Sequence, residues 1–158
     1  MARIMIQSIL VVCTGNICRS PIGERLLQQK LPTITIASAG TCALAGHPAD
    51  SQAQKIAALY GLSLADHVAH QLTATMMRQY DLILAMESGQ INQISLIAPE
   101  MRGKALLFGQ WLRAQEIPDP YGKSMEAFEY VFRLLGEASQ EWANRLTVKG
   151  LHTCRRKT

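Results

Sequence analysis

The sequence predicts an α/β domain with three layers, in which a parallel β-sheet lies between helices. Three observations predict this fold. Short apolar runs alternate along the chain with segments of helical periodicity, a pattern typical of parallel sheets. The first run, Ser8–Cys13, is continuously apolar, as in a strand buried on both of its faces. The 158 residues, 48% of them hydrophobic, suffice for one domain with a sizeable core.

The first half of the chain contains two predicted strands and two predicted helices. Ser20 can cap a helix over residues 20–31, since Pro21 fits a first helical turn. Asp50 can cap a second helix over residues 51–62, which ends near a glycine. The two strands are expected over residues 8–13 and 33–37.

The second half continues the alternation. Strands are expected over residues 82–86 and 105–108, and helices over residues 72–80, 88–97 and 125–146. The last helix is amphipathic, because its apolar residues recur at helical spacing, and its apolar face is interpreted as part of the core. Residues 109–124 contain two prolines close together, which exclude regular structure throughout this segment.

The charge and the cysteines limit the possible classes of protein. The net charge of +4 suits anionic ligands in general, and we expect no nucleic-acid partner. No apolar run approaches the roughly 18 residues that span a bilayer, so we expect no membrane insertion. The apolar start of the chain is interpreted as a strand and not as a signal peptide. Four cysteines in a chain of this length do not indicate a secreted disulfide framework, which favours a cytoplasmic location.

The domain is expected over residues 1–148, followed by a basic tail over residues 149–158. The tail is interpreted as a solvated, frayed end, and a contact with an acidic partner is the less favoured alternative. Cys42 and Cys154 are interpreted as incidental. No internal repeat or low-complexity segment accompanies the domain.

The stretch VCTGNICRS contains the residues that most suggest chemistry. It follows the first predicted strand, so it lies where parallel sheets bind their ligands. The N–H groups and the dipole of the following helix form an anion site there. Gly15 and Asn16 tolerate positive φ, and Arg19 can grip two oxygens of a phosphate group. Cys13 at the centre would then be a thiolate nucleophile.

Other interpretations of the two cysteines in this stretch are less well supported. A zinc site at Cys13 and Cys18 would need a second pair of ligands, and the four histidines are scattered along the chain. Cys13 and Cys18 are not spaced as a CxxC redox motif. Buried core thiols are common, but they do not come with a Gly-Asn pair and an arginine. The GxxxxGK[ST] pattern of nucleotide-binding loops is absent, so phosphate chemistry of another kind is favoured.

A thiolate that attacks an aryl phosphate needs an acid to protonate the leaving group. Asp119 is the candidate, because Pro118 and Pro120 stiffen the backbone on either side of it. Tyr121 can form an aromatic wall for a flat substrate ring. Considered alone, this stretch would be interpreted as a surface turn; together with the Cys13 loop, the acid role is favoured.

These motifs resemble those of the low-molecular-weight protein tyrosine phosphatases. Residues 12–21 match the signature V-C-x-G-N-I-C-R-S-P, and SAGT, Asp-His, YDLILAME and DPY follow in the family's order. The resemblance covers nearly the whole chain, and residues 98–124 are most similar to a Gram-negative branch encoded with exopolysaccharide and capsule export systems. The family implies a four-stranded parallel sheet of order 2-1-3-4, flanked by helices, with a phosphate-binding loop after strand 1.

The resemblance implies a role for each matching residue. Cys13 forms a phosphocysteine intermediate, Arg19 binds phosphate, and Asp119 protonates the phenolate and then activates water. Neither a metal nor another cofactor is implied. Cys18 matches the cysteine that can pair with the nucleophile under oxidation. The other implied site residues are Thr14, Gly15, Asn16, Ile17, Cys18 and Ser20 in the phosphate-binding loop, Ser38 and His67 in support, and Leu44 and Tyr121 as pocket walls.

The branch also implies a partner, the phosphotyrosine tail of a membrane tyrosine autokinase that controls polysaccharide export. Inorganic phosphate is then the product. Two departures from the eukaryotic pattern suggest a more open pocket: Leu44 stands where an aromatic wall is frequent, and Gly122 replaces a second tyrosine. His70 replaces a common arginine, and no physical reason explains that change.

Three rival functions stay open at this point. An arsenate reductase of the same fold needs two further cysteines to relay a disulfide, and residues 86–96 contain none. A non-catalytic phosphotyrosine-binding module would be expected to lose the nucleophile or the acid. A sugar-phosphotransfer carrier with a phosphorylated cysteine would not need Asp119. Hydrolysis of phosphotyrosine is therefore the favoured function.

Overall fold

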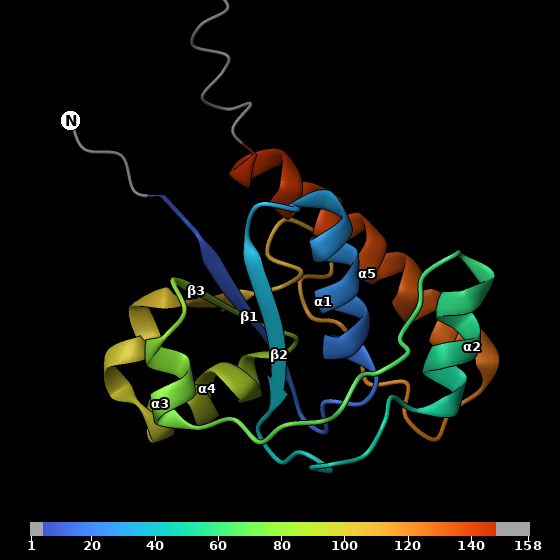
Figure 1. Ribbon diagram of the computed structural model, residues 1–158, viewed down its shortest axis with the longest axis horizontal. Helices are drawn as coiled ribbons and strands as arrows, with labels where there is room; N and C mark the ends of the chain where they lie inside the picture. Colours follow the sequence, from blue (N-terminus) through green and yellow to red (C-terminus); the bar gives the residue numbers. More distant parts are fainter. Residues whose placement is uncertain (1–4, 148–158) are drawn as a thin grey trace, which may run out of the picture.

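The computed structural model describes residues 5–147, and it has the predicted three-layer α/β architecture (Figure 1). Four parallel strands form one sheet in the order β2-β1-β3-β4, which confirms the predicted topology. The strands are β1 (Ser8–Cys13), β2 (Thr35–Gly40), β3 (Leu82–Ala85) and β4 (Ala105–Leu107).

Helices cover both faces of the sheet (Figure 1). The helices are α1 (Arg19–Lys30), α2 (Ser51–Leu59), α3 (Ala74–Arg78), α4 (Ser88–Ile97) and α5 (Met125–Leu146), with a 3-10 helix, η1, over Pro99–Lys104. One layer contains α1, α2 and α5, and the other contains α3 and α4. The predicted helices 88–97 and 125–146 are thereby confirmed.

Strand β1 lies in the middle of the sheet, and its sequence is apolar because both of its faces are covered. It pairs with β2 on one side and with β3 on the other. Side chains of a strand alternate between the two faces of its sheet. Ile9 and Val11 accordingly pack under α1 and α5, whereas Leu10 and Val12 pack under α3 and α4, and all four are fully buried.

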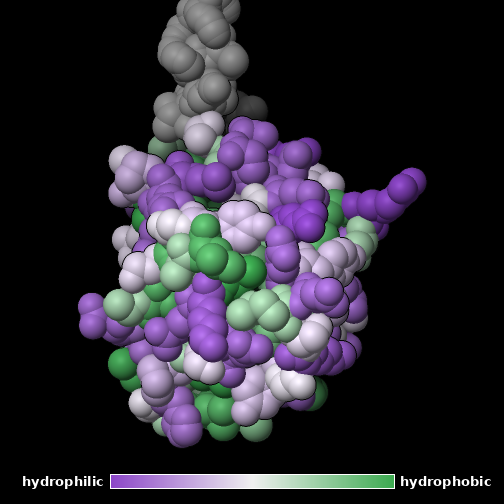
Figure 2. All heavy atoms as spheres, turned by 90° about the vertical axis from the view of Figure 1, so that its right-hand side faces the viewer, coloured by the Kyte–Doolittle hydropathy of each residue, from purple (hydrophilic) through white to green (hydrophobic). Residues whose placement is uncertain are grey.

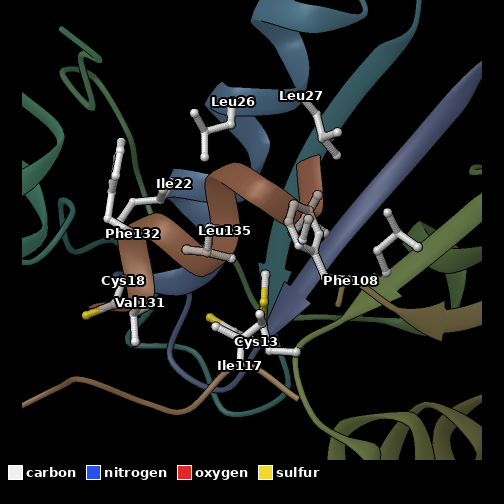
Figure 3. Packing of buried hydrophobic residues seen from close by; sticks show 14 of the residues in the cluster. Cys13, Cys18, Ile22, Leu26, Leu27, Phe108, Ile117, Val131, Phe132 and Leu135 are labelled. Carbon is white, nitrogen blue, oxygen red and sulfur yellow. The ribbon is translucent and has the colours of Figure 1, made fainter. Parts of the chain in front are cut away.

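The larger core lies between the sheet, α1 and α5. Ile22, Leu26 and Leu27 of α1 face Phe132 and Leu135 of α5 (Figure 3). Further along α5, Trp142 Nε1 donates a hydrogen bond of 2.8 Å to the carbonyl oxygen of Phe108. On their outer side, α2 and α5 present mostly polar side chains, with apolar ones in small groups (Figure 2). Helix α5 thus packs against α1, the helix that follows the loop after β1.

Two predicted element boundaries at the site were wrong. Helix α1 begins at Arg19, and its N-cap is Cys18 and not Ser20. Ser20 lies inside the first turn, where its hydroxyl contacts Cys13 Sγ. Strand β2 begins two residues later than predicted and continues through Ser38 to Gly40, where a loop was expected. The small side chains there let β2 stay in register with β1 as far as the pair Cys13–Gly40.

The remaining differences are at element ends: β3 ends at Ala85 and β4 at Leu107, each one residue earlier than predicted, and the others concern helices. Helix α2 ends at Leu59, three residues before the end of the predicted range, and the glycine predicted to stop it, Gly61, has a φ of 76°. Thr73 caps α3, which is shorter than the predicted 72–80, and the 3-10 helix was not predicted. Asp50 caps α2 as predicted, since its Oδ2 accepts the N–H groups of the second and third residues of the helix.

The ends of the chain lie outside the described residues, so the predicted basic tail over residues 149–158 and the boundary at 148 stay predictions, and Cys154 lies in the same part. Within residues 5–147, none of the helices is both long and apolar enough to cross a membrane.

Replacement of Leu135 tests the core between α1 and α5. Leu135 is fully buried, so Leu135→Ala is expected to lower the free energy of unfolding by about 2–5 kcal/mol, through lost burial and a residual cavity. Urea denaturation measures this change. Leu59, at the end of α2, is 76% exposed, and Leu59→Ala is expected to change stability by less than about 0.5 kcal/mol. Equal losses in the two variants would contradict the core described above.

Candidate active site

The loop after β1 forms the floor of a cavity at the carboxyl end of the central strand. The cavity has a volume of about 200 Å³. Residues from three distant parts of the chain line it: Cys13, Thr14, Gly15, Ile17, Cys18, Arg19, Cys42, Leu44, Asp119 and Tyr121. The structure thus brings together the predicted nucleophile, arginine, acid and pocket walls, and it adds Cys42, for which no role was predicted.

The backbone carbonyl groups of the loop are all bonded to the surrounding protein. Their oxygens accept hydrogen bonds of 2.7–3.1 Å: Cys13 from Thr41 N, Thr14 from Cys42 N, Gly15 from Leu44 N, Asn16 from His67 Nε2, and Ile17 from Asp50 N. The C=O and N–H groups of a trans peptide point in opposite directions, so the N–H groups of residues 14–18 turn inward. Within residues 5–147, those of Gly15, Ile17 and Cys18 donate to no acceptor. Together with the N-terminus of α1 they form a cradle for an anion.

Asn16 fixes the sharpest bend of the loop. It is fully buried and has a φ of 58°, a left-handed conformation that asparagine adopts more readily than most residues. Its Nδ2 donates hydrogen bonds to Ser20 Oγ at 2.7 Å and to Ser38 Oγ at 3.0 Å. Its Oδ1 accepts from the N–H group of His70 at 2.8 Å. The side chain is therefore fully used in holding the loop.

The thiol of Cys13 lies beside two hydrogen-bond donors. Its Sγ is 2.9 Å from Ser20 Oγ and 3.3 Å from the backbone nitrogen of Asn16. Ser20 Oγ accepts a hydrogen bond from the Asn16 side-chain amide, so the hydroxyl group of Ser20 is free to donate its own hydrogen bond to the sulfur. Both donors stabilise an anionic sulfur.

The second cysteine of the loop is chemically different. Cys18 is 4% exposed, and burial raises the pKa of its thiol well above the ordinary value, with the nearby Asp50 and Cys13 adding to the effect. A thiol with a raised pKa stays protonated at neutral pH and is a poor nucleophile. Of the two loop cysteines, Cys13 is therefore the one suited to attack.

Arg19 connects the loop to the segment that carries Asp119. The side chain of Arg19 is only 2% exposed, and its Nη1 donates a hydrogen bond of 2.8 Å to the carbonyl oxygen of Ile117. The same atom lies 3.3 Å from Glu87 Oε1, and Nη2 lies 3.8 Å from Asp119 Oδ2. A buried guanidinium with acceptors on both of its edges is held in place for an anion in the cradle.

The carboxyl group of Asp119 is half-exposed and lies on the cavity wall. The buried residue Ile117 anchors its segment, because the Ile117 N–H group donates to Met86 O at 3.0 Å while the carbonyl accepts from Arg19. Asp119 Oδ1 accepts the N–H group of Tyr121 at 3.0 Å, which sets the direction of the carboxyl group. Tyr121 and Leu44, the predicted pocket walls, both line the cavity and are half-exposed.

Ser38 and His67 support the loop from behind. His67 is 6% exposed, and its Nε2 donates to the carbonyl oxygen of Asn16 at 2.7 Å. Burial lowers the pKa of His67, although the hydrogen bond to Asn16 and the charge of Glu24 oppose this effect. Ser38 Oγ donates to Glu24 Oε1 at 2.5 Å, so a carboxylate ends the network that begins at the thiol.

Several residues of the site were not predicted. Gly40 lies so close to the loop that a Cβ atom would overlap the carbonyl oxygen of Thr14. Glu24 accepts a hydrogen bond from the Ser38 hydroxyl, and Glu87 pairs with Arg19. Gln90 donates to the side chain of Thr14. Two of these residues lie in motifs quoted above, Gly40 in SAGT and Glu87 in YDLILAME, and this was the available signal; Glu24 and Gln90 look like ordinary polar helix residues. Within the described part of the chain, no cluster of three His, Cys, Asp or Glu side chains could hold a metal ion.

A cradle of N–H groups around a thiol suits a phosphoryl group, and the thiol is placed to attack its phosphorus atom. This is the chemistry of a cysteine-dependent phosphatase. Residues 8–151 match the family model described as low molecular weight phosphotyrosine protein phosphatase. The chain belongs to this family and is a protein-tyrosine-phosphatase, so the predicted family and activity are confirmed.

Individual relatives agree with this assignment. The chain is 60% identical over 147 residues to the low molecular weight protein-tyrosine-phosphatase Etp of Escherichia coli strain K12, which covers 93% of this chain and 99% of Etp. It is similar to the crystal structure of the tyrosine phosphatase Wzb from Escherichia coli K30 in complex with sulphate, with a TM-score of 0.90 and 55% identity over 90% of this chain and 100% of Wzb. A more distant structure, the arginine phosphatase YwlE from Geobacillus stearothermophilus, has a TM-score of 0.85 and 32% identity over 92% of this chain and 96% of YwlE.

Replacement of Gly40 tests the close approach of β2 to the loop. Gly40→Ala is expected to lower kcat/KM for an aryl phosphate by more than about tenfold, because the added methyl group displaces the Thr14 carbonyl and tilts the amide cradle. Steady-state kinetics measures this loss. The matched variant Gly103→Ala adds a methyl group where no atom lies within 4 Å. A loss of the same size in both variants would contradict the role of Gly40.

Proposed function

We propose that the chain hydrolyses phosphotyrosine through a phosphocysteine intermediate on Cys13, with Arg19 as the phosphate-binding side chain and Asp119 as acid and then base. One observation carries this proposal: the Cys13 thiol and the Asp119 carboxyl group line the same cavity, whose floor is a cradle of backbone N–H groups. The nucleophile and the acid can therefore act from opposite ends of one phosphate ester.

In the first step the Cys13 thiolate attacks the phosphorus atom in line with the ester bond. A P–S bond forms while the P–O bond to the tyrosine ring breaks. Asp119 gives its proton to the departing phenolate oxygen, which leaves as a tyrosine hydroxyl. Arg19 and the inward N–H groups bind the three equatorial oxygens, on which charge is spread in the transition state.

In the second step water hydrolyses the intermediate. Asp119, now a carboxylate, takes a proton from the water molecule as its oxygen attacks phosphorus. The P–S bond breaks, inorganic phosphate forms, and the Cys13 thiolate is restored. Ser20 lies 2.9 Å from the sulfur and donates a hydrogen bond to it as it leaves. Side chains and water perform both steps, so the proposal invokes no cofactor.

The substrate that we propose is the phosphotyrosine tail of a membrane tyrosine autokinase of polysaccharide export, reached from the cytoplasm. The identity of 60% to Etp supports a place in the same branch. The open cavity mouth between Leu44 and Tyr121, both half-exposed, suits a tyrosine ring on a flexible segment. Arsenate reduction has no support, because residues 86–96 contain no cysteine. The alternative of a non-catalytic binding module also has no support, because the candidate nucleophile and the candidate acid line one cavity.

Replacement of the nucleophile tests the first step. Wild-type protein is expected to release p-nitrophenol from p-nitrophenyl phosphate in the presence of EDTA at mildly acidic pH. Cys13→Ser should lose turnover by more than about 10³-fold and still bind inorganic phosphate, because the cradle stays intact. Cys18→Ser is the matched control and should keep most of the turnover. Normal activity in Cys13→Ser would overturn the nucleophile assignment.

The same pair of proteins tests the proposed substrate. With a purified, autophosphorylated kinase of this type, wild-type protein is expected to remove the phosphate from the tyrosines of the tail, and Cys13→Ser is not. A phosphoarginine peptide serves as the competing substrate. Retention of the phosphotyrosine, or faster hydrolysis of phosphoarginine, would contradict the proposed substrate. Neither result would bear on the role of Cys13 as the nucleophile.

Replacement of Asp119 tests the acid. Asp119→Ala is expected to lower kcat by about 10²- to 10⁴-fold for phenols that are poor leaving groups, and by much less for good ones, because good leaving groups need no proton. A series of substituted phenyl phosphates measures this dependence. Glu116 lies in the same segment and accepts the N–H group of Ser88; Glu116→Gln should keep the wild-type dependence. An equal loss across the series would remove Asp119 as the acid.

A further inference from the structure

One buried side chain of α4 is bonded directly to the phosphate-binding loop. Gln90 is 3% exposed, and its Nε2 donates a hydrogen bond of 3.1 Å to Thr14 Oγ1. Its Oε1 accepts the N–H groups of Met86 at 2.8 Å and Glu87 at 3.0 Å. The amide is therefore oriented by two donors on one side, which leaves its NH₂ group directed to the loop.

The same helix turn also reaches the other end of the loop. Glu87 is the N-cap of α4 and forms a capping box with Gln90. The Glu87 carboxylate lies 3.3 Å from Nη1 of Arg19. Thr14 and Arg19 are the second and the last residues of the loop that runs from the nucleophile to the arginine. One capping box thus contacts both ends of the anion cradle.

The two halves of the cradle are held in different ways. Side chains that surround Asn16 hold the second half: Ser20, Ser38 and His67 all bond to it. The first half is more open, since Thr14 is exposed and lines the cavity. Within the described residues, the side-chain hydrogen bond to Thr14 comes from Gln90. Removal of this bond takes away the side-chain restraint on Thr14, whose carbonyl stays bonded to Cys42 N.

We propose that Gln90 is a positioning residue of the phosphatase: by holding the Thr14 hydroxyl it keeps the N–H groups of Thr14 and Gly15 directed at the phosphoryl group. The inference rests on the proposed role of the Cys13 loop as the active site. The bond also leaves the Thr14 hydroxyl proton free for an acceptor in the cavity, because Thr14 Oγ1 is the acceptor toward Gln90. The effect is on phosphate binding and on nucleophilic attack, and it leaves leaving-group protonation unchanged.

The test separates this role from simple capping of α4. Thr14→Val removes the hydroxyl with little change of shape and leaves the capping box intact. It is expected to raise the inhibition constant of inorganic phosphate by about 3- to 10-fold, the size of one lost hydrogen bond, with an unchanged melting temperature. Thr14→Ser restores the oxygen and should recover most of this loss. Equal inhibition constants in Thr14→Val and Thr14→Ser would overturn the proposal.

A double-mutant cycle then shows whether Gln90 acts through Thr14. Gln90→Glu keeps an oxygen to accept the Met86 and Glu87 N–H groups but loses the donor to Thr14. Its inhibition constant for phosphate should rise at least as much as that of Thr14→Val, and adding Thr14→Val to it should cause no further rise. Additive effects would overturn the proposal. Gln93→Glu, exposed on the same helix, is the charge-matched control and should bind phosphate as wild type does.

The leaving-group series gives an independent readout. If Gln90 positions the cradle, the Thr14 and Gln90 variants lose kcat/KM equally for good and poor leaving groups, in contrast to Asp119→Ala. A selective loss with poor leaving groups would overturn the proposal. A failure of the proposed function itself would have a different signature, because Cys13→Ser would then keep its turnover.

Discussion

The outward direction of five consecutive carbonyl groups, from Cys13 to Ile17, is the constraint on which the site depends. Each carbonyl that bonds to the surrounding protein turns the next N–H group toward the cavity, since a trans peptide fixes the two in opposite directions. The cradle is therefore made by the protein around the loop as much as by the loop. Because hydrogen bonds within the protein hold the cradle, its N–H groups are preorganised for a phosphoryl group.

Different elements of the fold supply the partners of those carbonyl groups. The segment that follows β2 provides N–H groups for the first three, and Asp50 provides one for Ile17 while its side chain caps α2. His67 reaches the fourth from a separate loop. Gly40 permits this approach, because any side chain there would overlap the loop. The position of β2 beside β1, and hence the sheet order, is thus directly connected to the shape of the anion site.

The sequence predicted the parts of the site that depend on local rules. The end of a buried parallel strand placed Cys13 at the mouth of the sheet, and the Asp119 segment followed from its chemistry. Local rules failed where a buried side-chain contact, and not the type of residue, decides the conformation. Ser20 is a good helix cap by type, yet the buried amide of Asn16 draws its hydroxyl toward the thiol. Gln90 resembles any polar residue in a first helical turn, and its contact with the loop spans 76 positions of sequence.

The buried guanidinium of Arg19 holds the loop of the proposed nucleophile and the segment of the proposed acid close to each other. It donates to the backbone of the segment that carries Asp119 and belongs to the loop that carries Cys13. A phosphoryl dianion in the cradle would share Arg19 with the carboxylates of Glu87 and Asp119. In the proposed mechanism, the ion pair with Arg19, whose Nη2 lies 3.8 Å from Asp119 Oδ2, would keep the Asp119 carboxylate beside the cradle during the second step. One arginine therefore connects the loop that carries the proposed nucleophile with the segment that carries the proposed acid.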